Sequence, residues 1–462
     1  MSQSISHRIR DQINLLRDHP HLPFSDFLHA DMVMGVLKEE GVRYRDRVFT
    51  PLVTLWTFLT QVLSLDHCCR KAVVSLTAYR TAQGMEPCSA DSGSYCKARQ
   101  RLPIGVITRL VRRIAQSLEE RVPENWLWKG RETLMVDGTT VSMPDTVKNQ
   151  QAFPQPRTQA PGLGFPIARV VAIISLATGV LRDLAIGPYK GKETGETALL
   201  RELLDRLKGG EILLGDRFFA SYFGIIALVQ RGVDGLFRMH QLRKYDFRRG
   251  KRLGISDHIV CWSKPPRPSW MTAAEYDALP EELRIRELRV RVKQPGFRVK
   301  EVILVTTLLD SVEYTNEELA QLYFQRWNIE LDLRSIKCVM QMDVLRCETP
   351  EMVIKEIWMH SLAYNLIRGV MAAAAEAHGK VPRQISFAGT LQTMTAFREV
   401  LHRAPPETRR LIVDVMLNAT ASHEVGNRPG RVEPRAIKRR PKPHDLLTEP
   451  RRQARKRLLR AA

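Results

Sequence analysis

The sequence lacks the cysteine patterns that a disulfide framework or a structural zinc site would need. Its seven cysteines are an odd number, none of them forms a Cys-x-x-Cys pair, and Cys68 is directly adjacent to Cys69. This usage argues against a disulfide-stapled secreted domain. It favours a reduced protein whose thiols are incidental.

Long hydrophobic runs are missing as well. The most apolar stretch, residues 170–181, is too short to cross a bilayer and contains the turn signal Thr178-Gly179. The segment from Met1 to Arg8 lacks the apolar centre of a signal peptide. We therefore expect a soluble cytoplasmic protein with no membrane partner.

Acidic residues are too few to balance the basic ones. The chain has 71 lysines and arginines against 50 aspartates and glutamates, a net charge of +21. An excess of this size favours a polyanionic partner, for which nucleic acid is the stronger candidate, and a merely soluble basic protein is the alternative. Residues 428–462 contain 13 lysines and arginines against 3 acids, together with several prolines. We expect them to form a disordered basic tail that binds nucleic acid nonspecifically.

The hydrophobic pattern changes along the chain from helical to mixed. Residues 1–127 repeat apolar positions at a spacing of three to four, which predicts a helical N-terminal domain, assigned to DNA binding. Residues 128–380 combine strands and helices in the mixed order of an α/β domain. Within them, residues 241–300 indicate a β-rich insertion. Residues 381–427 are expected to form a C-terminal helical region.

Two acids stand where buried strands are expected to end. Residues 134–136 lead into Asp137, and residues 212–214 lead toward Asp216. A carboxylate at the end of a strand is held rigidly and is still accessible, which suits metal binding. Each acid taken alone could equally initiate a turn or cap a helix, as Asp-Gly commonly does.

A third acid lies on a helix that the pattern predicts over residues 317–341. At 3.6 residues per turn, Tyr323, Arg326, Glu330 and Lys337 would stay within roughly 60° of one another. This face would carry a phenol, a guanidinium, a carboxylate and an ammonium, which together can bind both metal and phosphate. The alternative is a solvated face with an Arg326–Glu330 pair that contributes only a few tenths of a kcal/mol.

Together these motifs resemble the insertion sequence four family of bacterial DDE transposases. The spacing Tyr323-x-x-Arg326-x-x-x-Glu330-x-x-x-x-x-x-Lys337 matches the family signature without a gap. Residues 136–140 (Val-Asp-Gly-Thr-Thr) and 214–219 (Leu-Gly-Asp-Arg-Phe-Phe) resemble the segments around its first and second acids. Segments 187–193 and 362–366 are also similar, and the similarity runs from about Phe49 to Phe397 in matching order.

The resemblance implies a ribonuclease H-like catalytic core, interrupted by a β-rich insertion before the helix that carries the third acid. It implies that the catalytic metal ligands are Asp137, Asp216 and Glu330. It also implies phosphate contacts to DNA by the remaining signature residues and by an arginine that follows the second acid in a strand. These residues are Tyr323, Arg326, Lys337 and Arg238.

From the same resemblance we expect cleavage at the ends of an insertion sequence and strand transfer into target DNA. Three carboxylates without His or Cys ligands select two Mg²⁺ or Mn²⁺ ions. Two such ions can activate the attacking oxygen and stabilise the leaving one. The expected partners are double-stranded DNA, both transposon ends and target, and a second copy of the chain in a synaptic homodimer at the bacterial nucleoid.

Family members of this type can form a DNA hairpin, with a flipped base received by an aromatic residue of the insertion. Trp262 and Trp270 are the available tryptophans, and each could instead be a core residue. Two alternatives to an active transposase remain open at this point. One is a domesticated DNA-binding protein that does not cut, and the other is a nuclease without strand transfer.

Overall fold

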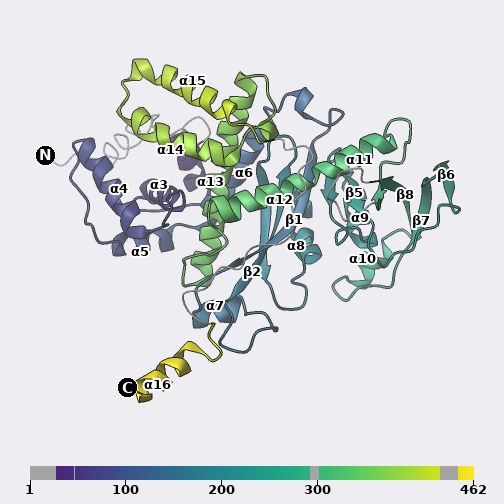
Figure 1. The fold of residues 1–462 in the computed structure, drawn as a ribbon, viewed down its shortest axis with the longest axis horizontal. Helices are drawn as coiled ribbons and strands as arrows, with labels where there is room; N and C mark the ends of the chain where they lie inside the picture. Colours follow the sequence, from purple (N-terminus) through teal and green to yellow (C-terminus); the bar gives the residue numbers. More distant parts are fainter. Residues whose placement is uncertain (1–27, 46, 292–300, 427–445, 462) are drawn as a thin grey trace. The chain divides into compact units, whose positions relative to one another are not determined.

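The computed structural model describes residues 28–45, 47–291, 301–426 and 446–461, which form a mixed α/β protein (Figure 1). The chain divides into two compact units, each built from stretches that are distant in sequence. Unit 1 comprises residues 1–130, 174–183 and 331–425, and unit 2 comprises residues 131–173, 184–330 and 426–462. Among the described residues, no helix has both the length and the apolar character needed to span a membrane.

Within the described residues, the strands form one sheet of nine, in the order β3-β2-β1-β4-β5-β9-β8-β7-β6. They are β1 (Thr133–Ser142), β2 (Ile167–Ser175), β3 (Leu181–Pro188), β4 (Ile212–Gly215), β5 (Asp234–Arg238), β6 (Lys251–Gly254), β7 (Asp257–Ser263), β8 (Glu282–Arg291) and β9 (Glu301–Thr306). A short helix, α7 (Val147–Ala152), lies between β1 and β2. Strand β4 runs parallel to both β1 and β5, whereas β9 pairs antiparallel with β5 and β8. Every residue of β4 is buried, as expected for a parallel strand that is covered on both faces.

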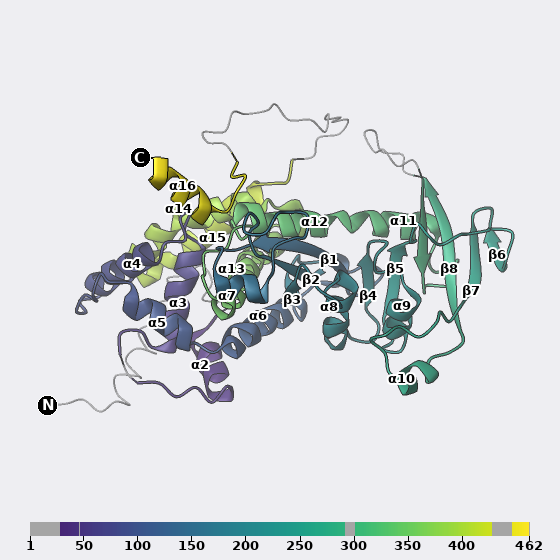
Figure 2. The same ribbon diagram turned by 90° about the horizontal axis from the view of Figure 1, so that it is seen from below.

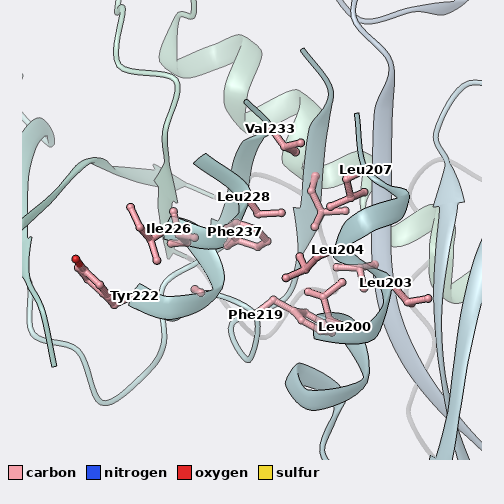
Figure 3. Packing of buried hydrophobic residues seen from close by; sticks show 14 of the residues in the cluster. Leu200, Leu203, Leu204, Leu207, Phe219, Tyr222, Ile226, Leu228, Val233 and Phe237 are labelled. Carbon is pink, nitrogen blue, oxygen red and sulfur yellow. The ribbon is translucent and has the colours of Figure 1, made fainter. Parts of the chain in front are cut away.

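Helices α8 (Glu196–Leu203) and α9 (Tyr222–Val229) cover one face of the central strands. In Figure 3 the leucines of α8 and of the 3-10 turn that follows it, η2 (Leu204–Arg206), pack with Phe219, Ile226 and Phe237. Helix α11 (Asn316–Gln325) lies on the opposite side of β4 and β5 (Figure 2). The strands that carry the candidate acids are therefore fixed between two layers of helix.

The sheet continues into the β-rich insertion expected over residues 241–300. Strands β6, β7 and β8 lie beyond β9 in the sheet order, and helix α10 (Ala273–Asp277) connects β7 to β8. Arg286 of β8 is fully buried and pairs with Asp257 at 2.7 Å, and it also donates to the carbonyl of Tyr314 at 2.6 Å. These bonds anchor the insertion to the chain just before α11. Residues 292–300, including the end of the strand expected at 288–292, lie outside the described residues.

The single helix expected over residues 317–341 is interrupted twice. Helix α11 ends at Gln325, α12 (Trp327–Arg334) begins after Arg326, and Ser335–Val339 form a π-helical turn, η3. At the first interruption the amide of Arg326 donates to the carbonyl of Tyr323, three residues back instead of four. The angular argument that placed Lys337 on the shared face assumed an uninterrupted helix. Because a π turn changes the rotation per residue, the position of Lys337 on that face stays a prediction.

Unit 1 consists of helices and the tip of the β2–β3 hairpin. The helices are α2 (Ala30–Glu39), α3 (Pro51–Val62), α4 (Cys69–Ala82), α5 (Gly93–Arg101), α6 (Ile104–Glu119), α13 (Pro350–Ala377), α14 (Phe387–Arg403) and α15 (Pro406–Ser422), with 3-10 turns η1 (Glu124–Trp126) and η4 (Pro382–Gln384). Helix α13 is buried along most of its length and packs against α6 and α3. Helices from both ends of the chain thus share one unit, which differs from the consecutive domains expected from the sequence. Helix α13 can be buried on all sides only if the N-terminal helices and the C-terminal helices both pack around it.

Two residues of the 362–366 segment hold the hairpin tip within unit 1. The Tyr364 hydroxyl donates to the carbonyl of Gly179 at 2.8 Å, and the Asn365 side chain bonds both the amide and the carbonyl of Leu181, each at 2.8 Å. Gly179 has a φ of +76°, and a Cβ there would lie 2.7 Å from the guanidinium carbon of Arg368. Only glycine fits this turn. The motif at 362–366 therefore has a structural role here.

The tail expected to be disordered over residues 428–462 is helical at its end. Helix α16 spans Arg451–Ala461, and residues 427–445 lie outside the described residues. From Arg451 onward the chain has no proline or glycine and consists of Arg, Lys, Leu, Ala and Gln, all good helix formers. Pro450 just before it suits the start of a helix. The expectation of disorder was wrong for this segment, because every proline of the tail precedes Arg451.

Candidate active site

Asp137 lies within β1, and Asp216 directly follows the neighbouring parallel strand β4. Met135 of β1 pairs with Leu214 of β4, and each acid follows two residues later, so the register brings the two acids to neighbouring positions, where the charge of Asp216 acts on Asp137. Strands in a sheet are about 4.8 Å apart, which keeps the two acids close. Asp216 directly follows β4, as expected. Asp137 does not end its strand, because β1 continues to Ser142 through β-branched residues that favour an extended chain.

Arg326 links Asp137 to Glu330. Its Nη1 donates to Asp137 Oδ2 at 3.4 Å, and its Nη2 donates to Glu330 Oε1 at 2.8 Å. The Arg326 side chain is only 14% exposed. An Arg326–Glu330 pair was the basis of the solvated-face alternative, but the arginine is half-buried and also reaches a second acid. This arrangement favours the site over the solvated-face alternative.

Burial raises the pKa of Asp137 to about 6. The Gly138 amide, which donates to Asp137 Oδ1 at 2.8 Å, and the Arg326 charge oppose this shift, whereas the charges of Asp216 and Glu196 add to it. At neutral pH the Asp137 carboxylate is therefore ionised at a cost in free energy. A cation bound beside it would relieve that cost.

Glu196 is a fourth carboxylate of this region, which sequence analysis missed. It is the first residue of α8 and lies against the backbone of Gly138, where an added Cβ would be 2.3 Å from Glu196 Oε1. Burial raises the pKa of Glu196, which Arg169 lowers and Asp216 raises further. No motif spacing marks Glu196. The one signal available in the sequence was the glycine after Asp137, which leaves room for a neighbouring side chain.

Arg238 and Tyr323 belong to the same neighbourhood. Arg238 is the last residue of β5, and the pairing of Gly215 with Phe237 places it next to Asp216. Tyr323 is 8% exposed. Burial raises the pKa of Tyr323 to about 12, and the positive charges of Arg326 and Arg238 partly oppose the shift. The phenol is therefore protonated at neutral pH and can donate a hydrogen bond.

Lys337 differs from the other three signature residues because it belongs to unit 1. It lies half-buried in η3 of unit 1, whereas Asp137, Asp216, Arg238, Tyr323, Arg326 and Glu330 all belong to unit 2. The expected contact of Lys337 with phosphate stays a prediction.

The donor chemistry of the three acids fits a hard divalent cation. Asp137, Asp216 and Glu330 supply carboxylate oxygens with no His or Cys beside them, the set that Mg²⁺ and Mn²⁺ prefer. As placed, no three His, Cys, Asp or Glu side chains of the described residues converge closely enough to hold a metal ion. The guanidinium of Arg326 stands between the carboxylates of Asp137 and Glu330 and pairs with both.

A cavity of about 940 Å³ lies beside these acids within unit 2. Its lining comes from the start of α8, the loop between β4 and α9, and the segment after β5, and it includes Glu196 and Phe218. Three arginines, Arg169, Arg217 and Arg243, also line it. Sequence analysis did not single them out, although Arg217 directly follows Asp216.

The two tryptophans of the insertion differ in accessibility. Trp262 is 4% exposed and donates from Nε1 to Glu287 Oε1 at 2.8 Å, so it is a core residue. Trp270 is half-buried. Its ring centre lies 6.0 Å from that of Phe223 in an edge-to-face arrangement and 3.9 Å from the Arg201 guanidinium carbon. Only Trp270 keeps surface that a stacked base could reach.

Comparisons with known proteins add to this geometry. Residues 128–366 match the family described as Transposase DDE domain. The chain is 29% identical over 434 residues to the transposase InsG for insertion sequence element IS4 of Escherichia coli (strain K12), covering 92% of this chain and 93% of that protein. It is 35% identical over 69 residues to the transposase for insertion sequence element IS421 of Escherichia coli, covering 15% and 19%. Among solved structures it is similar to a piggyBac transposase synaptic complex with hairpin DNA, with a TM-score of 0.43, 10% identity, and coverage of 86% of this chain and 85% of that chain.

Proposed function

Since the chain belongs to the Transposase DDE domain family, as a DDE transposase of the insertion sequence four family, we propose that Asp137, Asp216 and Glu330 form its metal-binding active site. The family resemblance drawn from the motifs is thereby confirmed, and with it the assignment to phosphoryl-transfer enzymes. One observation carries the proposal for the site. The register of β1 and β4 brings Asp137 to a position neighbouring Asp216, and Asp137 is linked through Arg326 to Glu330 on α12.

We further propose that the core of unit 2 is ribonuclease H-like. The strand order β3-β2-β1-β4-β5, with β4 parallel to β1 and β5, supports this topology. Two acids on neighbouring parallel strands and a third on a helix that follows the insertion are consistent with it. The rigid sheet would fix two ligands, and the helix would deliver the third.

Enzymes of this family generally use divalent metal ions. Held by Asp137, Asp216 and Glu330, two Mg²⁺ or Mn²⁺ ions would activate the attacking oxygen and stabilise the leaving one. Arg326, released from its two carboxylates, would be positioned to grip a DNA phosphate. Tyr323 would donate a hydrogen bond through its protonated hydroxyl, and Arg238 and Lys337 would add positive charge near the cleaved phosphodiester.

The reaction consists of two displacements at phosphorus. In the first, water attacks the phosphodiester at a transposon end, the bond from phosphorus to the 3′ oxygen breaks, and a 3′-hydroxyl is released. In the second, that hydroxyl attacks a phosphodiester of target DNA and forms a bond to its phosphorus. The bond from this phosphorus to the target's 3′ oxygen breaks, and the target strand leaves with a free 3′-hydroxyl. Each step exchanges one phosphorus–oxygen bond for another. The partners are double-stranded DNA and a second copy of the chain, in the bacterial cytoplasm at the nucleoid.

The test is turnover on the DNA that flanks the protein's own gene. The purified full-length protein, incubated with that labelled DNA and Mg²⁺, should release 3′-hydroxyl ends and join them to target DNA. Glu330→Gln and Asp137→Ala should bind the DNA and give no product. Joined product from Asp137→Ala would contradict the proposal. Binding without turnover by the wild type would indicate a silent DNA-binding protein, and cleavage without joining would indicate a nuclease.

A further inference from the structure

The cavity beside the acids is more positive than its own residues can balance. Of the charged side chains that line it, three are arginines (Arg169, Arg217 and Arg243) and one is a carboxylate (Glu196). Among the described residues, the charge of Arg169 acts on Glu196, whose pKa it lowers, and Arg217 donates to an uncharged amide, that of Gln241. Guanidinium groups gathered in a concave site carry an electrostatic cost that an anion can offset. The lining therefore selects an anionic occupant.

Arg169 has hydrogen-bond donors to spare. Its Nη1 donates to the carbonyl of Thr194 at 2.6 Å, its Nε has no partner, and its guanidinium carbon lies 4.9 Å from the centre of the Tyr189 ring. These contacts fix the plane of the guanidinium, and its Nη2 forms no hydrogen bond within the described residues. A planar fork of N–H groups held in this way matches two oxygens of a phosphate.

Arg217, another arginine of the lining, is fixed in a similar manner. It follows Asp216 directly, its Nη1 donates to Gln241 Oε1 at 2.6 Å, and its guanidinium lies 5.6 Å from the centre of the Phe218 ring. Glu196, at another part of the lining, lies against Gly138 beside the first acid. The cavity thus borders the residues that flank both aspartates.

We propose that this cavity holds the sugar-phosphate backbone of the cleaved DNA strand, with Arg169 and Arg217 contacting a phosphodiester next to the one that is cut. The inference rests on the proposed function, since it assumes that DNA is cleaved at the neighbouring acids. It assigns the two arginines as positioning residues that set which phosphodiester reaches the carboxylates. Arg243, whose guanidinium lies 3.6 Å from the Trp262 ring centre, extends the same positive wall.

The test uses the full-length protein and DNA of its own gene ends, in which single phosphates around the cleavage site are replaced by neutral methylphosphonates. Binding is measured with Ca²⁺ in place of Mg²⁺ at several salt concentrations. At one or two positions the neutral linkage should weaken wild-type binding about tenfold. In Arg169→Met and in Arg217→Met the same linkage should cause no further loss, and the salt dependence should fall by about one ion per contact.

Arg231→Met is the control. Arg231 also lies in unit 2 but is paired with the exposed Asp205 outside the cavity, so its loss should keep the wild-type linkage pattern. Arg169→Met and Arg217→Met test the same contact with the DNA backbone. If one variant does not fold, the other still tests the inference. Equal linkage penalties in folded variants and wild type would overturn the inference, as would competition by inorganic phosphate without any linkage effect. If the wild-type protein shows the linkage effect in binding but never cuts the unmodified DNA in Mg²⁺, the proposed function would be overturned instead.

Discussion

Arg326 and Asp137, 189 positions apart in the chain, are joined by a hydrogen bond of 3.4 Å from Nη1 to Oδ2. The same guanidinium donates to Glu330 at 2.8 Å. One arginine therefore stands between two of the three carboxylates proposed to hold metal. Its guanidinium places a positive charge between them.

Arg326→Ala should bind metal more tightly than the wild type, because the ion no longer competes with a guanidinium. We expect the affinity for Mn²⁺, measured by calorimetry or electron paramagnetic resonance, to rise about tenfold, while affinity for DNA falls. Arg326→Lys, which keeps a charge but cannot fork between two acids, should lie in between. An unchanged or weaker Mn²⁺ affinity in a folded Arg326→Ala protein would refute the competition.

Asp137→Asn should stabilise the metal-free fold at neutral and alkaline pH. Because the folded-state pKa of Asp137 is about 6, above its ordinary value of 3.8, the folded protein favours the protonated acid. The ionised acid thus costs stability above pH 6 and nothing below pH 4. The free energy of unfolding in urea with EDTA should rise by up to about 3 kcal/mol at pH 8, and the gain should vanish at pH 4. A variant that is less stable than the wild type at pH 8 would contradict this.

Asp332→Ala should be strongly destabilising. Its carboxylate is fully buried within unit 1, where it accepts bonds from Arg368 and from Arg383, the latter at 2.7 and 2.8 Å. Removing it leaves two arginines without their counterion, at a cost of about 3–5 kcal/mol in the free energy of unfolding. Urea unfolding measures this. Asp205→Ala, which removes an exposed partner of Arg231, should change little, and a similar small effect at Asp332 would show that the buried pair is not needed.

The sequence predicted the central features of unit 2 because they depend on local patterns. Runs of apolar residues predicted β1 and β4, and the spacing of the signature residues predicted that Glu330 lies on a helix. The point at which β1 ends could not be predicted from the acid itself, since the strand continues through Asp137 and Gly138 to Ser142. The break at Arg326 was equally hidden, because no proline or glycine marks it.

What the sequence could not supply was proximity between distant segments. Glu196 and Arg169 carry no motif, and their place beside the acids depends on how α8 and β2 pack against β1. The sharing of unit 1 by helices from both ends depends in the same way on the burial of α13. Such contacts follow from tertiary packing, which a single sequence read by periodicity does not encode in any one segment.

The most direct test of the metal-binding carboxylates is a change of metal preference in Asp216→Cys. A thiolate is a soft ligand that binds Mg²⁺ poorly and accepts Mn²⁺ or Cd²⁺. Cleavage of end-containing DNA should be lost in Mg²⁺ and restored, at least in part, when Mn²⁺ with a trace of Cd²⁺ is supplied, while Asp216→Ala should stay inactive with every metal. Full activity of Asp216→Cys in Mg²⁺, or cleavage by Asp216→Ala under any of these conditions, would contradict the assignment of Asp216 as a metal ligand.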